Sequence, residues 1–265
     1  MSPITKLRGS YTLMIVIIAT TIAQMGAILA CQVRSGTILG SIFSCAIIVL
    51  FGYMLGMMIW RIIRQMYVSQ RWIKHFRARK HGKLTKHLNY IYRNWGTEII
   101  VVQDDSFVAL TIGLIRPKIV VSTMVLDRFS KMEVKAILLH ERYHCLNHDG
   151  RKLFLSSLLV DAFGYLPIVK PIVSYYETWK ELLADRYAME QMGTEFYVGN
   201  ILLKLAKREN LQRCKTAVYF ANTTLQYRMM QVLEPEQVVK VPLSLLKPFL
   251  RTCSILLLLI VGGDS

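Results

Sequence analysis

The chain has 265 residues, of which 53% are hydrophobic and 19% charged, and its 33 Lys and Arg outnumber 17 Asp and Glu to give a formal net charge of +16. Its five cysteines form no spaced framework, which argues against a disulfide-stapled secreted scaffold and favours reduced thiols. The apolar residues and the positive charges are each concentrated in particular segments, and this distribution indicates a membrane protein.

The first 60 residues contain two uncharged apolar runs, Tyr11 to Cys31 and Thr37 to Trp60, of 21 and 24 residues. Either run is long enough to cross a hydrocarbon core of about 30 Å. The short connection from Gln32 to Gly36 therefore predicts a transmembrane hairpin over residues 1–60. A cleaved lipoprotein signal is the alternative, because basic residues precede the first run and an Ile-Leu-Ala-Cys sequence ends it. We favour the hairpin, because the first run exceeds a typical signal core of roughly 7 to 15 residues and a second run follows.

A basic segment over residues 61–97 follows the second apolar run. Between Arg61 and Arg93 there are ten Lys or Arg and no Asp or Glu, whereas the loop between the two runs holds only Arg34. The positive-inside rule therefore places the N-terminus and everything after Trp60 in the cytoplasm. Nucleic-acid binding is an alternative for such a segment. We favour a juxtamembrane helix on anionic lipid, because no helix-turn-helix or zinc-finger spacing accompanies the charges.

Three short β-branched runs come next and predict a small sheet within a domain spanning residues 98–240. They cover Glu98–Gln103, Phe107–Thr111 and Lys118–Ser122, and turn-forming residues separate them. An edge of this sheet can pair with an extended peptide, or the sheet can simply pack against the helix that follows. The sequence leaves both roles open.

Residues 140–144 read His-Glu-Arg-Tyr-His within a pattern that predicts a helix. Two histidines four residues apart share one face of a helix, so the imidazoles of His140 and His144 can bind one Zn²⁺ with Glu141 beside them. Cys145 projects in a different direction around the helix, and we expect it to pack in the interior.

The ends of this predicted helix also carry signals. Ser130 and Glu133 have the spacing of a capping box, and Gly150 is a candidate terminator. The motif therefore lies well inside a helix, where the geometry of two ligands on one face applies.

A second predicted helix, from about residue 176 to residue 191, offers a third ligand. Glu177, Glu181 and Asp185 recur every four residues and so share one face. Spacing alone leaves Glu177 and Glu181 nearly equal as candidates. The alternative for this face is a set of solvated carboxylates that pair with nearby Lys and Arg side chains.

Four motifs of this chain occur in the order seen in a known family. They are Ile112 to Val121 (IGLIRPKIVV), the HERYH sequence at 140–144, Asp149, and Glu181 to Arg186 (ELLADR). Together they resemble the integral-membrane metallopeptidases of the BlaR/MecR antibiotic-sensor type, over roughly Trp60 to Leu205.

The resemblance implies a mainly α membrane protein, in which the N-terminal transmembrane hairpin precedes a gluzincin-type α+β zinc peptidase domain with a small sheet. It also implies the roles of the site residues. The zinc ligands are then His140, His144 and Glu181, the general base is Glu141, and the carboxylates that orient the imidazoles are Asp149 and Asp185.

The sequence also departs from the sensor members of that family. Those members carry a second membrane hairpin and an extracellular penicillin-binding domain, whereas this sequence ends at Ser265 soon after an apolar run. We therefore expect a short relative without the sensor domain.

Leu153 to Tyr175 is apolar enough to resemble a further membrane span. A single crossing would place Glu181 on the opposite side of the membrane from His140 and His144, so the zinc site requires a buried or re-entrant helix pair instead. Asp161, Pro167, Lys170 and Pro171 favour the pair, because ionisable groups are costly at bilayer depth.

The last segment, residues 241–265, is predicted to be membrane-associated. Thr252 to Val261 forms an uncharged core, and Lys247 and Arg251 before it can reach the interface, so the segment is a candidate third span or a surface helix. Between Thr194 and Gln237 the pattern is mostly amphipathic helix, which we expect to cover the catalytic core.

These observations predict a membrane zinc endopeptidase that cleaves a cytoplasmic or membrane-associated protein, with a transcriptional repressor as a candidate partner. We expect the lipid bilayer as its environment and no direct contact with nucleic acid, and the sequence does not specify an oligomeric state. The oxyanion donor is open, with Arg186 or Tyr187 as candidates. One rival is a non-catalytic signalling or scaffold protein whose structural zinc takes His148 as a fourth ligand; another is a lipid or nucleic-acid binder built on the basic segment.

Overall fold

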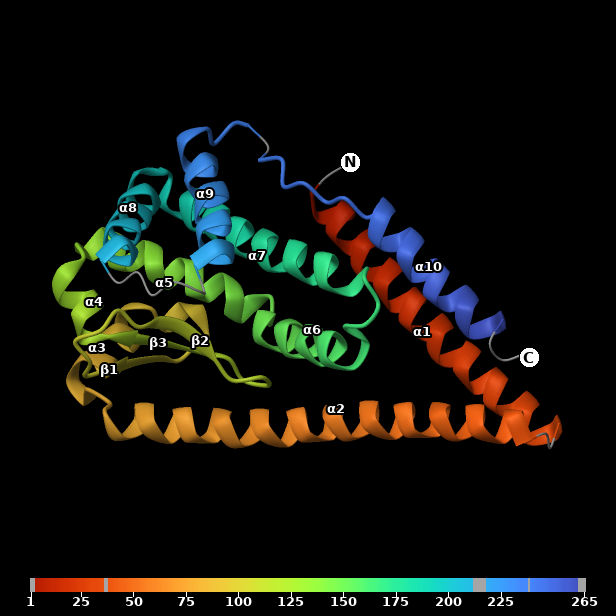
Figure 1. Ribbon diagram of the computed structural model, residues 1–265. Coiled ribbons are helices and arrows are strands. Elements are labelled where there is room, and N and C mark those ends of the chain that lie inside the picture. The colour runs from red at the N-terminus through yellow and green to blue at the C-terminus, as the bar shows by residue number, and fades with distance from the viewer. Residues whose placement is uncertain (1–2, 36–37, 212–217, 238, 262–265) are drawn as a thin grey trace. The chain divides into compact units, whose positions relative to one another are not determined.

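The computed structural model describes residues 3–35, 38–211, 218–237 and 239–261. This part of the chain is mainly helical and includes a small three-stranded sheet, as the sequence predicted (Figure 1). Its backbone contacts define two compact units, each built from separate stretches of sequence. The first unit takes residues 1–65, 155–177 and 242–265, and the second takes residues 66–154 and 178–241.

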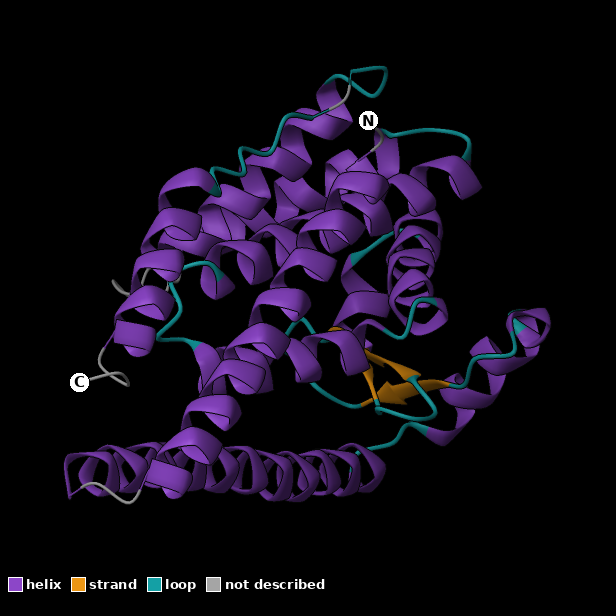
Figure 2. Ribbon diagram, turned by 90° about the vertical axis from the view of Figure 1, so that its right-hand side faces the viewer, coloured by secondary structure: helices purple, strands orange, loops and turns teal. Residues whose placement is uncertain are grey.

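The second unit contains the sheet, whose strands are β1 (Ile99–Val102), β2 (Ala109–Ile112) and β3 (Lys118–Ser122) (Figure 2). The strand order is β1-β3-β2, so β2 lies at an edge. The central strand β3 pairs parallel with β1 and antiparallel with β2. The three strands coincide with the three predicted β-branched runs, apart from small shifts at their ends.

The second unit also contains these helical elements: α3 (Gly82–Ile91), the 3₁₀ turn η1 (Arg93–Trp95), α4 (Thr123–Arg128), α5 (Lys131–Leu146), α8 (Phe196–Leu211) and α9 (Val218–Leu233). The core forms where the sheet packs against α5 and where α5 packs against α8. Ile99, Ile119, Val121, Leu138 and Leu202 all have no exposed surface there. Such continuous burial of β-branched and leucine side chains stabilises the elements that carry the site.

The start of α5 is the predicted capping box, because the backbone amide of Glu133 donates to Ser130 Oγ and the amide of Ser130 donates to the Glu133 carboxylate. The end differs from the prediction. The helix stops at Leu146, and His148 takes a left-handed conformation with φ of 51°. Gly150 is not the terminator, since it already belongs to the first turn of α6 (Asp149–Phe163).

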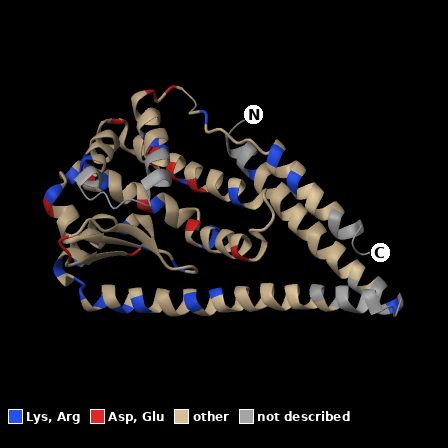
Figure 3. Cartoon of the chain, viewed as in Figure 1, with Lys and Arg blue, Asp and Glu red and all other residues tan. Residues whose placement is uncertain are grey.

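The first unit contains α1 (Pro3–Ser35), the N-terminal part of α2 (Ile38–Ala78) and α10 (Leu246–Val261). Arg8–Ile28 and Ile48–Ala78 are apolar and long enough to cross a membrane. Of the predicted connection from Gln32 to Gly36, residues 32–35 belong to α1, and Gly36 lies outside the described residues. The helix α2 likewise continues past Trp60 through the first part of the basic segment (Figure 3).

The segment from Leu153 to Tyr175 forms two helices rather than one. Five residues separate the end of α6 at Phe163 from the start of α7 (Val169–Met192), and a side chain at Gly164, the first of them, would collide with the Val160 carbonyl oxygen. Polar groups of α6 have partners in the first unit. Asp161 forms an ion pair with Arg61, and the Ser156 and Tyr11 hydroxyl oxygens lie 2.8 Å apart.

Candidate metal centre

The helix α5 carries both predicted histidine ligands on one face. The Nε2 atoms of His140 and His144 lie 3.2 Å apart, and the two side chains are only 13% and 10% exposed. The next two helices, α6 and α7, place carboxylates beside both imidazoles. The two histidines therefore lie in a largely desolvated, acidic site.

The third donor is Glu181, which α7 places opposite the two imidazoles. Its Oε2 lies 3.3 Å from His140 Nε2, and its Oε1 lies 3.7 Å from His144 Nε2. One donor atom from each of the three residues lies within 4.8 Å of the others. Glu177, the equal candidate by spacing, is exposed and does not belong to this group.

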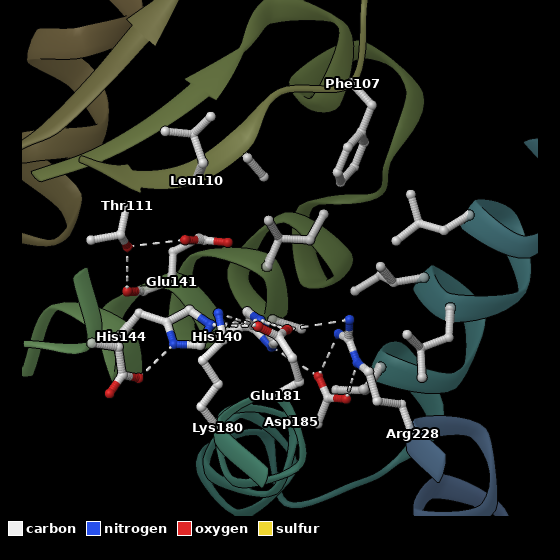
Figure 4. Close-up of a pocket in the computed structure, with 18 of the residues that line it drawn as sticks. Phe107, Leu110, Thr111, His140, Glu141, His144, Lys180, Glu181, Asp185 and Arg228 are labelled. Carbon is white, nitrogen blue, oxygen red and sulfur yellow. Dashed lines mark hydrogen bonds and ion pairs between the residues drawn. The ribbon is translucent and has the colours of Figure 1, made fainter. Parts of the chain in front are cut away.

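Two further carboxylates fix the orientation of the imidazoles (Figure 4). His140 Nδ1 lies 2.8 Å from Asp185 Oδ1, and His144 Nδ1 lies 2.8 Å from Asp149 Oδ2. Because an ionised carboxylate only accepts hydrogen bonds, each Nδ1 carries the proton. Each Nε2, the ring nitrogen left for a metal, therefore faces the other imidazole and Glu181.

Three lone-pair donors that converge in this way fit a small cation. A tetrahedral Zn²⁺ with bond lengths of about 2.0–2.1 Å holds its ligand atoms roughly 3.3 Å apart. The two Nε2 atoms are 3.2 Å apart, and each lies 3.3 or 3.7 Å from one of the two Glu181 carboxylate oxygens, which is close to that value. Two imidazoles and one carboxylate are also the donor set of many catalytic zinc sites, in which a fourth position stays open.

The charges of the site are strongly coupled. Burial lowers the pKa of His140, but the carboxylates of Asp185 and Glu181 outweigh this effect and raise it to about 10. Burial likewise opposes ionisation of Glu181, and His140 and Arg228 hold its pKa well below the usual range. A metal that binds here replaces a proton among these groups, so metal affinity depends on pH.

A cavity of about 370 Å³ opens beside these three residues. Glu141 lies on its wall with only 8% of its surface exposed, and the Thr111 hydroxyl lies 3.0 Å from the Glu141 Oε2 atom and 2.9 Å from its backbone oxygen. Thr111 ends the second predicted strand, and no sequence pattern indicated that it contacts Glu141.

Two cations also lie on the cavity wall, of which the sequence analysis missed Arg228. Arg228 on α9 donates from Nε and Nη2 to the two oxygens of Asp185 at 2.6 and 2.8 Å, and its Nη1 lies 3.4 Å from Glu181 Oε2. Lys180 Nζ lies 3.1 Å from Glu181 Oε1. Arg186 and Tyr187, the predicted oxyanion donors, are not among the residues that line the cavity, and the Tyr187 hydroxyl accepts from Arg142.

The residues predicted for other roles lie elsewhere. His148, the candidate fourth ligand of a closed zinc site, is outside the donor group and lines a separate hollow with Trp95 and Pro117. Cys145 is 4% exposed and packs as expected, and burial raises the pKa of its thiol to about 11.

Comparisons with known proteins identify the family of this chain. The family model described as BlaR1 peptidase M56 matches residues 4–232. The "Regulatory protein BlaR1" of Bacillus licheniformis is 29% identical over 97 residues, which cover 36% of this chain and 16% of that protein. A "Protease HtpX homolog" of Bacteroides fragilis strain YCH46 is 28% identical over 91 residues, or 34% of this chain and 28% of that protein.

The matched segments thus span less than a third of either relative. The family model, by contrast, covers most of this chain and includes every residue of the donor group. The resemblance that the four motifs indicated is confirmed, and the chain belongs to the BlaR1 peptidase M56 family.

Proposed function

We propose that this chain is an integral membrane, zinc-dependent endopeptidase. The observation that carries the proposal is the convergence of His140, His144 and Glu181 at a cavity whose wall also holds the buried carboxylate of Glu141. A closed structural zinc site needs a fourth protein ligand, whereas this group supplies three and has open space beside it.

In this mechanism the three donor residues would hold the ion, and Asp149 and Asp185 orient the two imidazoles by accepting from their Nδ1 atoms. When bound, zinc supplies Lewis acidity, which polarises the scissile carbonyl and lowers the pKa of water. The Glu141 carboxylate accepts a proton from the attacking water and delivers it to the leaving amine nitrogen. The Thr111 hydroxyl holds that carboxylate in place.

The edge strand β2 is suited to align a substrate. Ala109, Leu110 and Thr111 line the cavity, and β2 pairs with β3 on one side. An extended polypeptide that pairs with the other edge of β2 would run past Glu141 and the donor group. The sheet would then have both of the roles that the sequence left open. Its edge would pair with a peptide, and β2 also packs against the helix α5.

The cellular setting follows from the sequence pattern. We propose a multi-pass protein in the cell membrane whose catalytic domain, within residues 98–240, faces the cytoplasm, because the basic segment follows the second candidate span. One relative is named a regulatory protein, which favours regulated cleavage of a substrate such as a transcriptional repressor over general protein turnover.

Two measurements test the proposal. Protein purified in detergent should contain about one equivalent of zinc, and the double variant His140→Ala, His144→Ala should lose it. Glu141→Gln should keep the zinc but lower the rate of cleavage of a labelled unfolded protein by about 10²- to 10⁴-fold, because the amide cannot accept the proton.

Glu177→Gln is the matched control, since Glu177 is exposed on α7 and lies outside the donor group. It should retain both zinc and activity. Stoichiometric zinc in the double histidine variant, or wild-type cleavage by Glu141→Gln, would refute the proposed site.

A further inference from the structure

The turn between β2 and β3, residues 113–117, carries an apolar side chain at its tip (Figure 1). Ile115 is 83% exposed, more than any other large hydrophobic side chain that the structure describes. The turn is tightly constrained, because Gly113 has a φ of 98° and a side chain there would collide with the Arg116 carbonyl oxygen. The ring of Pro117 fixes a further backbone angle. The exposure of Ile115 is therefore built into the fold.

Further apolar side chains lie beside Ile115, around a hollow of about 520 Å³. Trp95 of η1 and Leu146, the last residue of α5, line this hollow together with Ile115. Leu146 is 51% exposed. Three elements that are distant in sequence thus bring large apolar side chains to one place on the surface of the second unit. Clustered, exposed apolar side chains with polar residues around them are typical of a surface that contacts a partner or a membrane.

Basic side chains accompany this cluster. Arg116, next to Ile115 in the turn, is exposed and lines the same hollow. Lys118 also lines it, and its Nζ lies 2.5 Å from a carboxylate oxygen of Glu98. Apolar side chains and Trp beside cations are the composition of a surface that rests among anionic lipid headgroups, where the apolar groups reach the acyl chains and the cations lie near the phosphates.

The first turn of α6 connects this surface with the membrane-associated part of the chain. Gly150 in that turn lies close to the base of the β2–β3 turn, because a Cβ built on Gly150 would be 3.7 Å from the Gly113 carbonyl oxygen. Exposed Arg151 and Lys152 follow. The same helix passes at Leu155 into the first unit, which contains the first candidate span. Only about 8 Å of helix separate Gly150 from that point, at 1.5 Å per residue.

We propose that Trp95, Ile115, Arg116, Lys118 and Leu146 form a membrane-docking surface whose partner is the anionic phospholipid of the bilayer that holds the chain. Ile115 and Leu146 enter the boundary between headgroups and acyl chains, and the two cations lie at the level of the phosphates. Because Leu146 ends the helix that carries both histidines, docking holds the candidate metal centre at a fixed distance from the lipid surface. The proposal concerns residues outside the cavity and does not depend on the peptidase chemistry.

Hydroxyl-radical footprinting of the unmodified chain tests whether a bilayer covers this surface. The chain is placed in nanodiscs of phosphatidylcholine and phosphatidylglycerol, and oxidation is measured residue by residue. Leu146 and Leu203 are a matched pair, because they are the same residue type and are 51% and 47% exposed. Leu146 should be oxidised about fivefold more slowly or less, since even one cation at an anionic surface favours docking by about that factor. Equal rates at the two leucines would overturn the proposal.

Photo-crosslinking identifies what covers the surface. A p-benzoylphenylalanine placed at the position of Ile115 or Leu146 should form adducts with phospholipid in these nanodiscs, which mass spectrometry detects. The same probe in place of Met132 should form none above background, because Met132 is 42% exposed but lies at the opposite end of α5 from Leu146. Adducts with a second copy of the chain instead of lipid, or equal lipid adducts at Met132, would contradict lipid docking.

The contribution of the cations is tested by the lipid composition. Replacing phosphatidylglycerol by phosphatidylcholine should lower the yield of lipid adducts at Ile115, and Arg116→Gln should weaken this dependence. Arg128→Gln is the matched control, since Arg128 is exposed at the end of α4 and does not line the hollow, and it should leave the dependence unchanged. A yield that does not respond to phosphatidylglycerol would exclude anionic lipid as the partner.

Discussion

At the scale of single residues, the two histidines are held in different ways. The left-handed conformation of His148 ends α5, so Asp149 at the start of α6 turns back to His144, five residues earlier. Asp185 is instead held by Arg228, which lies 43 residues later in the chain. Removing Asp185 would leave the Arg228 charge without its closest partner, so protein stability would change together with metal binding. Asp149 is therefore the better position at which to measure orientation alone.

We predict that Asp149→Ala lowers zinc affinity about 10- to 100-fold without abolishing binding, because the imidazole of His144 loses the acceptor that fixes its tautomer and orientation. Competition against a chromophoric chelator measures this change. Asp105→Ala, at an exposed position outside the cavity, should bind zinc as the wild type does. Equal affinity of the two variants would show that Asp149 does not contribute to the site.

The sequence predicted those parts of the site that follow from the spacing of residues along a single helix. Spacing alone places His140 and His144 on one face, because four residues nearly complete a helical turn. The same rule left Glu177 and Glu181 undecided, since both share a face of α7 and only tertiary packing buries one of them. Thr111 and Arg228 reach the site through long-range contacts, and no local pattern in the sequence reports such contacts.

At the scale of elements, the start of α5 combines a local signal with a distant one. The Ser130–Glu133 capping box follows from the sequence, but the Glu133 carboxylate also accepts from Lys204 of α8 at 2.7 and 2.8 Å. Burial would raise the pKa of Glu133, and the contacts with Lys204 and Ser130 outweigh it and lower the pKa below its ordinary value. The start of α5 was therefore predictable from the sequence, whereas the ion pair between Glu133 and Lys204 that joins α5 to α8 was not.

We predict that Lys204→Met lowers the free energy of unfolding at pH 7 by about 1–2 kcal/mol, because the ionised Glu133 loses its cationic partner. A carboxylate with a lowered folded-state pKa contributes stability above its unfolded pKa and loses it as the pH falls through the folded pKa. The difference in the free energy of unfolding between wild type and variant should therefore be largest at pH 7 and decrease below about pH 4.5.

Thermal unfolding across this pH range measures the gap between wild type and Lys204→Met. Lys207→Met, exposed on the same helix, is the control and should follow the wild type. A destabilisation by Lys204→Met that stays constant down to low pH would assign the effect to packing on the Phe129 ring, which lies 4.8 Å from Lys204 Nζ.

At the scale of the whole molecule, the compact units are discontinuous in sequence. The chain leaves the second unit after Phe154 and returns to it at Thr178, and the donor group draws on residues from both sides of this excursion. The division into residues 1–60, 61–97, 98–240 and 241–265 remains a prediction. It consists of consecutive segments, whereas each compact unit combines separate stretches of sequence. The sequence did indicate that the segment between the histidines and Glu181 must begin and end on the same side of the membrane, because all three residues are needed for one site.

That requirement makes topology the decisive prediction for the molecule. Glu181 can complete a site with His140 only if residues 155–177 do not cross the bilayer, and the two helices α6 and α7 with the Arg61–Asp161 ion pair fit a segment that turns back. We expect reporters fused after Gly150 and after Met192 both to read cytoplasmic, because the basic segment follows the second candidate span, and a reporter within residues 32–36 to read external. Opposite readings after Gly150 and Met192 would exclude a site built from these three residues in one chain.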